Sequence, residues 1–333
     1  MDLFKVKFNR RQFIRNMTAG SMALLYSCSK DLTAIGEEDP TDYGSLLPTK
    51  VALFKTSDRI QGVQKVLQLL EFPPMQGKRV VLKPNFNTED PPPASTHNDT
   101  LRQLILEIQN RGASSITLAE RSNHVFDEVI RQKGIDVMAG ELGFAIKNLD
   151  TDEYSIFSRD DLHWSNGFRL PRTIGEAEYI VSTCCLKTHF VGVITMSLKL
   201  SVGILPYLHM NELHRSARLN SMVAEINLAY QPQLIVMDGI KTFISGGPSS
   251  GTLADGNVML AGTDRIAIDA VGTAILKDLG STVVGGKIFN IEQIRRAIQL
   301  NLGIRKPDQI RFVTDDEPSR IYAERLTTIL AEG

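Results

Sequence analysis

The chain has 333 residues, with 37 Lys and Arg against 38 Asp and Glu, so its formal net charge is −1 at pH 7. This balance argues against a nucleic-acid-binding protein, which normally carries an excess of basic residues. Hydrophobic residues make up 42% of the chain, which is enough for a large core. No stretch reaches the roughly 20 apolar residues of a membrane-spanning helix. The three cysteines, Cys28, Cys184 and Cys185, form no CxxC motif, so we expect neither a disulfide framework nor an iron–sulfur cluster.

Residues 1–28 have the layout of an export signal. A basic head with a single acid precedes a short, weakly apolar run rich in Ala, Gly and Ser. The sequence Asn-Arg-Arg-Gln-Phe-Ile at 9–14 resembles a twin-arginine signal, and Leu-Tyr-Ser-Cys at 25–28 resembles a bacterial lipobox ending at Cys28. These resemblances imply export by the twin-arginine translocase and a lipid anchor at Cys28, on the periplasmic or outer face of the cell envelope. The alternative is a basic amphipathic first helix of a cytoplasmic domain.

Residues 29–50 are rich in Ser, Thr, Gly, Pro and acids, so we expect a flexible tether before a folded domain at 50–333. In that domain, short apolar runs typical of buried strands alternate with segments of helical periodicity. The expected strands lie at 51–54, 79–83, 116–119, 179–182, 234–237, 258–261 and 310–313, and the expected helices at 60–70, 101–109, 264–279, 290–301 and 318–331. The pattern predicts an α/β fold with a layered, largely parallel sheet flanked by helices. Residues 150–176 interrupt it and predict a small inserted hairpin or subdomain.

Polar residues follow several of the expected strands. Because ligands of open α/β sheets bind past the carboxyl ends of strands, we expect these residues to form one polar site. They include Lys83 with Asn85, then Glu120, then the run Lys187-Thr188-His189, then Asp238, and finally Thr263 with Asp264.

Three lysines, Lys83, Lys187 and Lys199, are the most informative of these residues. Ammonium groups brought together repel one another unless an anion or a carboxylate lies between them. Such a cluster would bind a phosphate or carboxylate, or would hold one lysine at a lowered pKa for general-base or Schiff-base chemistry. The alternative is that each lysine ends a strand and points into water.

Two segments offer backbone N–H groups to an anion. A helix that begins near Thr195 would present Thr195, Ser197 and the N–H groups of its first turn, with Lys199 on the same face. The glycine-rich turn that contains Gly246 and Gly247 can form an anion-binding concavity, although it lacks the Lys-Ser/Thr ending of a P-loop. The alternatives are a buried helix capped by Thr and a plain turn.

The histidines suggest proton transfer more than metal binding. His209 and His214 are five residues apart, which is not the i, i+4 spacing that places two ligands on one helical face. General acid–base catalysis by His189 or His214 is the favoured functional interpretation. A divalent metal held by acidic side chains and histidines remains a weaker alternative, with Glu120, Asp238, Asp264 and Asp269 as the acids.

Several of these segments together resemble the domain-of-unknown-function 362 family. They are Leu-Lys-Pro-Asn at 82–85, Leu-Ala-Glu at 118–120, the run 185–199, Asp-Gly-Ile at 238–240, the turn 246–251 and 263–270. The resemblance covers roughly residues 50–280 and implies a fold and a site location but no reaction. Some members carry an added ferredoxin-like domain, whose cysteines are missing here. The family often has Asn after the second lysine of this run, whereas Leu200 follows Lys199 here.

These observations predict an exported, lipid-anchored enzyme that acts on a small anionic substrate, either a carboxylate or a phosphate. The catalytic candidates are Lys83, Lys187, His189 and His214. The substrate-binding candidates are Asn85, Thr195, Lys199, Gly246 and Gly247. Two alternatives remain: a non-catalytic envelope lipoprotein that binds an anionic ligand or partner, and a metal-dependent enzyme with Glu120 and Asp238 as ligands.

Overall fold

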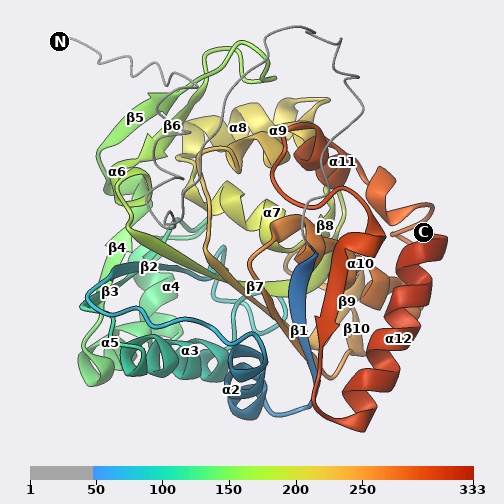
Figure 1. The fold of residues 1–333 in the computed structure, drawn as a ribbon. Coiled ribbons are helices and arrows are strands. Elements are labelled where there is room, and N and C mark those ends of the chain that lie inside the picture. The colour runs from blue at the N-terminus through green and yellow to red at the C-terminus, as the bar shows by residue number, and fades with distance from the viewer. Residues whose placement is uncertain (1–47) are drawn as a thin grey trace, which may run out of the picture. The chain divides into compact units, whose positions relative to one another are not determined.

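A mixed ten-stranded sheet organises residues 48–333, the part of the chain that this computed structural model describes (Figure 1). In spatial order the main path is β12 (Ile310–Val313), β1 (Thr49–Lys55), β11 (Val258–Gly262), β9 (Leu234–Gly246), β7 (Tyr179–His189), β2 (Arg79–Lys83), β3 (Ser115–Glu120) and β4 (Ala145–Asn148). Two further strands, β10 (Gly251–Asp255) and β8 (Val193–Thr195), pair antiparallel with β9 and β7.

Most neighbouring strands on the main path run parallel, as the sequence predicts. The exception is β11, which is antiparallel to both β1 and β9. The export signal predicted for residues 1–28 lies outside the described residues, as does the tether up to residue 47. The tether was expected to end at residue 50, whereas β1 already begins at Thr49.

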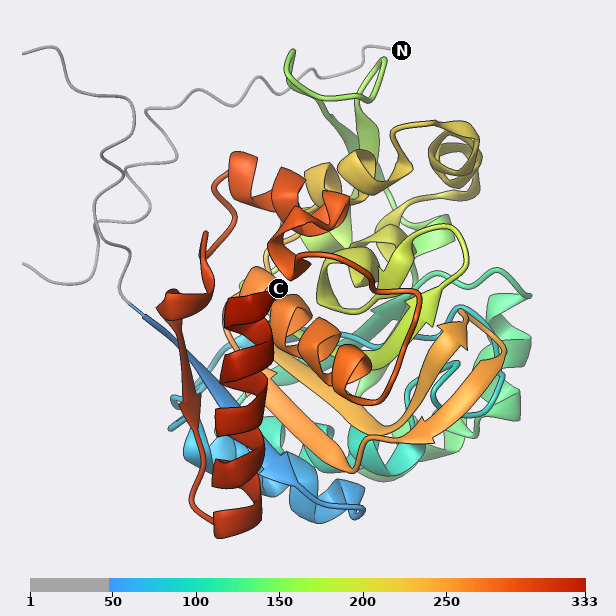
Figure 2. The ribbon, with the colours of Figure 1, turned by 90° about the vertical axis from the view of Figure 1, so that its right-hand side faces the viewer.

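Helices cover both faces of the sheet. One face carries α2 (Arg59–Leu69), α3 (Asn98–Asn110), α4 (Phe126–Gln132) and α5 (Ile135–Leu142). The other carries α7 (Ser197–Leu200), α8 (Tyr207–Arg215), α9 (Leu219–Ile226), α10 (Arg265–Asp278), α11 (Glu292–Gln299) and α12 (Glu317–Glu332). Figure 2 shows α12 standing beside β1. Short helical turns are α6 (Arg172–Gly175), η1 (Leu149–Thr151), η2 (Ser201–Ile204), η3 (Ile288–Asn290) and η4 (Pro307–Gln309).

The two covered faces explain the apolar runs from which the strands were predicted. In β1, Val51 and Leu53 pack into the core beneath α10 and α12, whereas Ala52 packs into the core beneath α2 and α3. Successive residues of a strand point to opposite faces, so a strand that is buried on both sides carries apolar side chains at consecutive positions. Among the described residues, no helix is long and apolar enough to cross a bilayer.

The expected insertion is a separate two-stranded antiparallel sheet, formed by β5 (Tyr154–Phe157) and β6 (Phe168–Pro171). Between these strands, Trp164 is buried against Phe168, with ring centroids 5.3 Å apart. The insertion predicted for residues 150–176 is therefore confirmed.

Two central strands are much longer than predicted. The expected strands at 179–182 and 234–237 continue to His189 and Gly246, so Lys187, Thr188 and Asp238 lie inside strands and not after them. The apolar runs in the sequence end early because the residues that follow them are polar. The strands nevertheless continue, because these polar side chains are buried with hydrogen-bond partners. Thr188 Oγ1, for example, donates to Phe243 O at 3.1 Å. Burial of a satisfied polar group does not interrupt a strand.

Candidate functional site

A cavity of about 190 Å³ lies where β2, β7 and β8 meet α7 and α8. Its lining brings together seven of the residues singled out from the sequence: Lys83, Asn85, Lys187, His189, Thr195, Lys199 and His214. They come from chain segments up to about 130 residues apart, as Lys83 and His214 illustrate. Within residues 48–333, no Asp or Glu belongs to the lining.

The pairing of β7 with β9 is irregular at the point where β7 borders the cavity. Cys184, Lys187 and His189 all line the cavity, although residues three apart in a regular strand point to opposite faces. The pairing of β7 with β9 shifts register between Cys185 and Lys187. Across this shift β7 advances by two residues, from Cys185 to Lys187, whereas β9 advances by five, from Asp238 to Phe243, so the extra residues lie in β9. Such an irregularity bends and twists the strand pairing locally, and Lys187 and His189 line the same cavity as Cys184.

Lys83 is neutralised inside the protein. It is fully buried at the end of β2, and its Nζ donates to Glu120 Oε1 at 2.6 Å and to Pro84 O at 3.0 Å. The Glu120 carboxylate also accepts from the backbone N–H groups of Phe86 and Arg121, at 2.9 and 2.8 Å. Burial lowers the pKa of Lys83, and the Glu120 charge opposes that effect. This ion pair therefore stiffens one wall of the cavity without adding net charge.

Lys187 and Lys199 have no carboxylate partner. Lys187 is 1% exposed, and its Nζ donates to two carbonyl oxygens, Ala94 O at 2.5 Å and Pro248 O at 3.1 Å. Lys199 is 9% exposed, and no hydrogen-bond acceptor for its amine lies among the described residues. Burial, with a smaller contribution from the Lys187 charge, lowers the pKa of Lys199 to about 8. Burial also lowers the pKa of Lys187. The cavity thus holds two cations that a ligand anion would stabilise.

The two histidines of the cavity have opposite hydrogen-bonding characters. His189 Nδ1 accepts from the backbone N–H groups of Val191 and Gly192, both at 3.0 Å, so the ring proton of neutral His189 lies on Nε2. His214 Nδ1 lies 2.7 Å from Met210 O, and a carbonyl can only accept, so Nδ1 carries the proton and Nε2 has a free lone pair. Burial, followed by the nearby Lys199 charge, lowers the pKa of His189 to about 2. His189 is therefore a fixed neutral donor, whereas His214 is able to accept a proton.

The start of α7, where the sequence suggested an anion site, is occupied by a carboxylate of the protein itself. The carboxylate of Asp269 accepts from the N–H groups of Ser197 and Leu198, at 2.8 and 3.0 Å, and so already occupies that position. Thr195 is the last residue of β8, not of the helix. Its hydroxyl oxygen is buried without a hydrogen-bond partner, and the residue lines the cavity. Thr195 thus offers an unused hydroxyl, while Asp269 holds α7 and Lys199 in place.

Gly246 and Gly247 lie outside the lining, and their turn contributes Pro248 instead. The N–H of Gly247 donates to Ser250 O at 2.6 Å, so it is not free for an anion. Glycine is required here for another reason: at Gly247, with φ of +75°, a Cβ atom would lie 2.0 Å from Thr188 O. Gly247 therefore allows close packing of this turn against β7.

Glu120 and Asp238 do not share a metal site. Glu120 belongs to the pair with Lys83, whereas Asp238 accepts from Arg59 Nε at 2.8 Å and from Thr100 Oγ1 at 2.9 Å. These two partners come from α2 and α3, on the sheet face that those helices cover. In residues 48–333 no group of three His, Cys, Asp or Glu side chains is placed to hold a metal ion.

Arg121 is a cavity residue that was not singled out. It is 4% exposed and lines the cavity, its Nη1 donates to Asn123 Oδ1 at 2.7 Å, and its Nε lies 3.6 Å from Asp150 Oδ1. Asn87 and Asn123 also belong to the lining. Arg121 directly follows Glu120 at the end of β3, the kind of position at which ligands of open α/β sheets bind.

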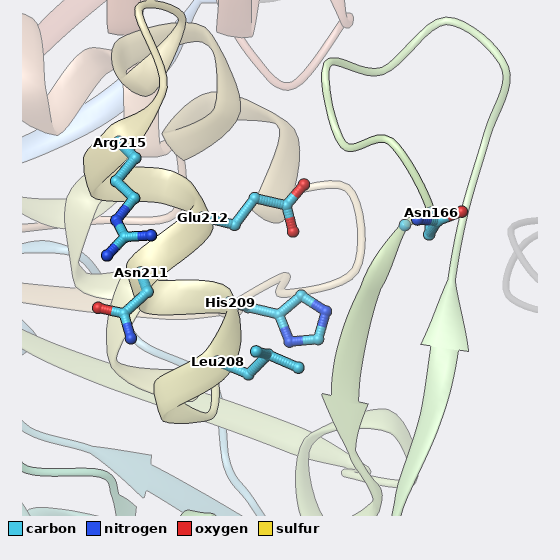
Figure 3. A pocket seen from close by; sticks show the side chains of 7 residues that line it. Asn166, Leu208, His209, Asn211, Glu212 and Arg215 are labelled. Atoms are coloured by element: carbon cyan, nitrogen blue, oxygen red, sulfur yellow. The ribbon is translucent and has the colours of Figure 1, made fainter.

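A second cavity, of about 370 Å³, lies between α8 and the β5–β6 insertion. Figure 3 shows His209 and Glu212 extending from α8 toward the segment that carries Asn166. His209 Nδ1 is buried without a hydrogen-bond partner. This cavity contains none of the seven residues brought together in the first one.

Comparison with known proteins supports the resemblance seen in the sequence. A thylakoid-associated protein of Synechocystis sp. is 25% identical over 208 residues, which are 60% of this chain and 64% of that protein, so the chain spans less than two thirds of this relative. The family model described as domain of unknown function (DUF362) matches residues 80–274. That segment is more than half of the chain and contains every cavity-lining residue named above. The chain therefore belongs to the DUF362 family.

Proposed function

We propose that this protein is an enzyme that binds a small anionic substrate, a carboxylate or a phosphate, in the first cavity. One observation carries the proposal: four cationic residues, Lys83, Arg121, Lys187 and Lys199, line a cavity whose described lining contains no acid. Glu120 neutralises Lys83, and Asp150 lies near Arg121. Lys187 and Lys199 remain uncompensated, and burying such charges is costly unless an opposite charge joins them.

The size of the cavity favours a small substrate. Its volume of about 190 Å³ lies below the ~300–1,000 Å³ of sites that hold drug-sized ligands. In this proposal Lys187 and Lys199 bind the anionic group, and Asn85 and Thr195 orient the substrate. His189 Nε2–H donates to an oxygen on which negative charge develops, and His214 Nε2 moves the proton.

Anion binding is tested by calorimetric titration of the full-length protein with inorganic phosphate and with succinate. Lys187→Met and Lys199→Met each remove one charge at nearly constant side-chain length, and we expect at least tenfold weaker binding from either. Lys65→Met is the matched control, because Lys65 pairs with Asp315 at the surface. A wild-type protein that binds neither anion, or three variants that bind equally, would refute the proposed site.

Catalysis is distinguished from simple capture by His214→Gln, tested by profiling activity against small carboxylates and phosphates. Gln preserves the size of the side chain but cannot accept a proton. Retained affinity with lost turnover supports an enzyme. If the wild type and His214→Gln both bind the anion and neither turns it over, the result supports the alternative. That alternative is an envelope lipoprotein that captures an anionic ligand or partner.

We also propose that the twin-arginine translocase exports the protein and that lipidated Cys28 anchors it at the periplasmic or outer face of the envelope. The paired arginines at 10 and 11 and the lipobox-like ending at Cys28 support this. The name of the Synechocystis relative associates that protein with the thylakoid. Arg10→Lys with Arg11→Lys preserves charge and should retain the protein in the cytoplasm. Cys28→Ser should release it from the membrane fraction. Unchanged fractionation of both variants would refute the proposal.

A further inference from the structure

Lys199 differs from the other two lysines of the cavity. Lys83 is held by Glu120, and Lys187 is held by the carbonyl oxygens of Ala94 and Pro248. Lys199 lines the same cavity, yet its amine has no hydrogen-bond partner in the described part of the chain. Of these three lysines, Lys199 is the one whose Nζ donates no hydrogen bond to an acceptor in the described residues.

The stem of Lys199 is nevertheless fixed. A Cβ atom at Gly192 would lie 3.0 Å from Lys199 Cε and 3.3 Å from its Cδ, so Gly192 leaves just enough room for the side chain. Asp269 holds the start of the helix that carries Lys199. A buried amine on a fixed stem, with its nitrogen at the cavity, has the placement of a nucleophile.

Burial also changes the protonation of this amine. With its pKa lowered to about 8, roughly a tenth of Lys199 is unprotonated at pH 7, about three-hundredfold more than for a lysine at its usual pKa. An unprotonated amine attacks carbonyl carbons, which an ammonium group cannot do. Lys187 and Arg121 remain to bind an anionic group of the same molecule.

We propose that Lys199 is a covalent catalyst and that the substrates are small carboxylates that also carry a carbonyl group, the class of 2-oxo acids. This inference rests on the proposed function, because the same cavity must first bind the carboxylate. The neutral Nζ attacks the carbonyl carbon and forms a carbinolamine. The carbinolamine then loses the former carbonyl oxygen and both amine protons as water, which leaves an imine between Nζ and the substrate carbon.

The two histidines supply the remaining parts of this step. His189 Nε2–H donates to the carbonyl oxygen as negative charge develops on it. His214 Nε2 takes the two protons of the attacking nitrogen in turn. It delivers the first to the oxyanion, which becomes the carbinolamine hydroxyl, and the second to that hydroxyl, which leaves as water. No oxidant or reductant is needed, because condensation of an amine with a carbonyl changes no oxidation state.

The experiment incubates the full-length protein with pyruvate or glyoxylate and sodium cyanoborohydride, which reduces an imine to a stable secondary amine. Peptide mapping then locates the modified lysine. We expect modification of Lys199 at least tenfold faster than of the surface control Lys65, and we expect inorganic phosphate to suppress it by competing for the cavity. Lys199→Met should lose the fast modification, and Lys65→Met should keep it.

Modification of Lys199 no faster than that of Lys65, or without protection by phosphate, would overturn the inference. Mapping of the wild type alone decides this even where Lys199→Met fails to fold. Succinate separates the two proposals, since it has the charge but no carbonyl group. Binding of succinate without imine trapping refutes covalent catalysis and leaves the proposed function standing, whereas absence of both refutes both.

Discussion

Replacing Lys199 by methionine tests the electrostatics of the cavity directly. The substitution keeps an unbranched side chain of similar length and removes the ammonium group. Lys199 is 9% exposed and has no carboxylate partner, and burial lowers its pKa from 10.5 to about 8. The wild type must therefore bury an unfavourable charge whenever the pH lies below about 8, and Lys199→Met does not.

The size of the effect follows from the shift in pKa. A lowering by about 2.5 units corresponds to about 3 kcal/mol of folding free energy. Below pH 8 the amine is charged in both folded and unfolded chains, so this cost is present in full. Between pH 8 and 10.5 the unfolded chain binds more protons than the folded one, so stability of the wild type rises with pH. We expect the advantage of Lys199→Met to be greatest near pH 7 and to shrink by about 3 kcal/mol toward pH 10.5.

The measurement is urea unfolding of the full-length protein at pH 7, 8, 9 and 10, in buffers free of phosphate and carboxylates. A difference in packing between Met and Lys contributes equally at every pH. The informative quantity is therefore the change with pH of the difference in unfolding free energy between the wild type and Lys199→Met. Lys65→Met should show no such change, because Lys65 forms a partly exposed surface pair with Asp315. Added phosphate should stabilise the wild type more than Lys199→Met, since it binds the folded state.

A stability difference between wild type and Lys199→Met that stays constant from pH 7 to pH 10 would refute the reasoning. It would mean that the amine of Lys199 titrates as an ordinary exposed lysine. Lys199 would then pay no cost of burial in the cavity, and Lys187 alone would remain as the buried, uncompensated cation of the proposed function.

Three further substitutions test the walls of the cavity. Glu120→Gln leaves Lys83 buried without a carboxylate, so urea unfolding should show a loss of about 3–5 kcal/mol; adding Lys83→Met should recover part of it, and a loss below about 1 kcal/mol would contradict the buried pair. Gly203→Ala places a Cβ 2.5 Å from Glu120 Oε1 and 2.6 Å from Lys83 Nζ, for an expected loss of about 1–3 kcal/mol. Gly140→Ala is the control, because a Cβ at this position in α5 would have no atom within 4 Å; its unfolding free energy should rise by about 0.5–1 kcal/mol. Equal melting temperatures for Gly203→Ala and Gly140→Ala would argue against the close approach of Gly203 to Glu120 and Lys83. Asp269→Ala removes the acceptor at the start of α7, so phosphate should bind more weakly in calorimetry, and unchanged affinity would show that α7 needs no such support.

Local patterns were enough to predict most of the fold. The apolar run at 51–54 became β1, and Asp58, which precedes the helical pattern at 60–70, caps α2 by accepting from Gln61 N at 3.1 Å. These features depend on side chains close together in the chain, whose periodicity and capping chemistry are local properties. The ends of β7 and β9 were misjudged because Lys187 and Asp238 are polar, and only distant partners make their burial possible.

The sequence by itself determined the α/β class, the polar strand ends and the cationic character that Lys83, Lys187 and Lys199 share. Only the tertiary structure decided that these lysines meet in one cavity, that Glu120 neutralises Lys83, and that Asp238 belongs to another part of the molecule. The protonation of His189 and Lys199 likewise depends on groups that fold against them. The physical reason is that spacing along the chain controls which face a side chain occupies, whereas burial and charge pairing are created by residues remote in sequence.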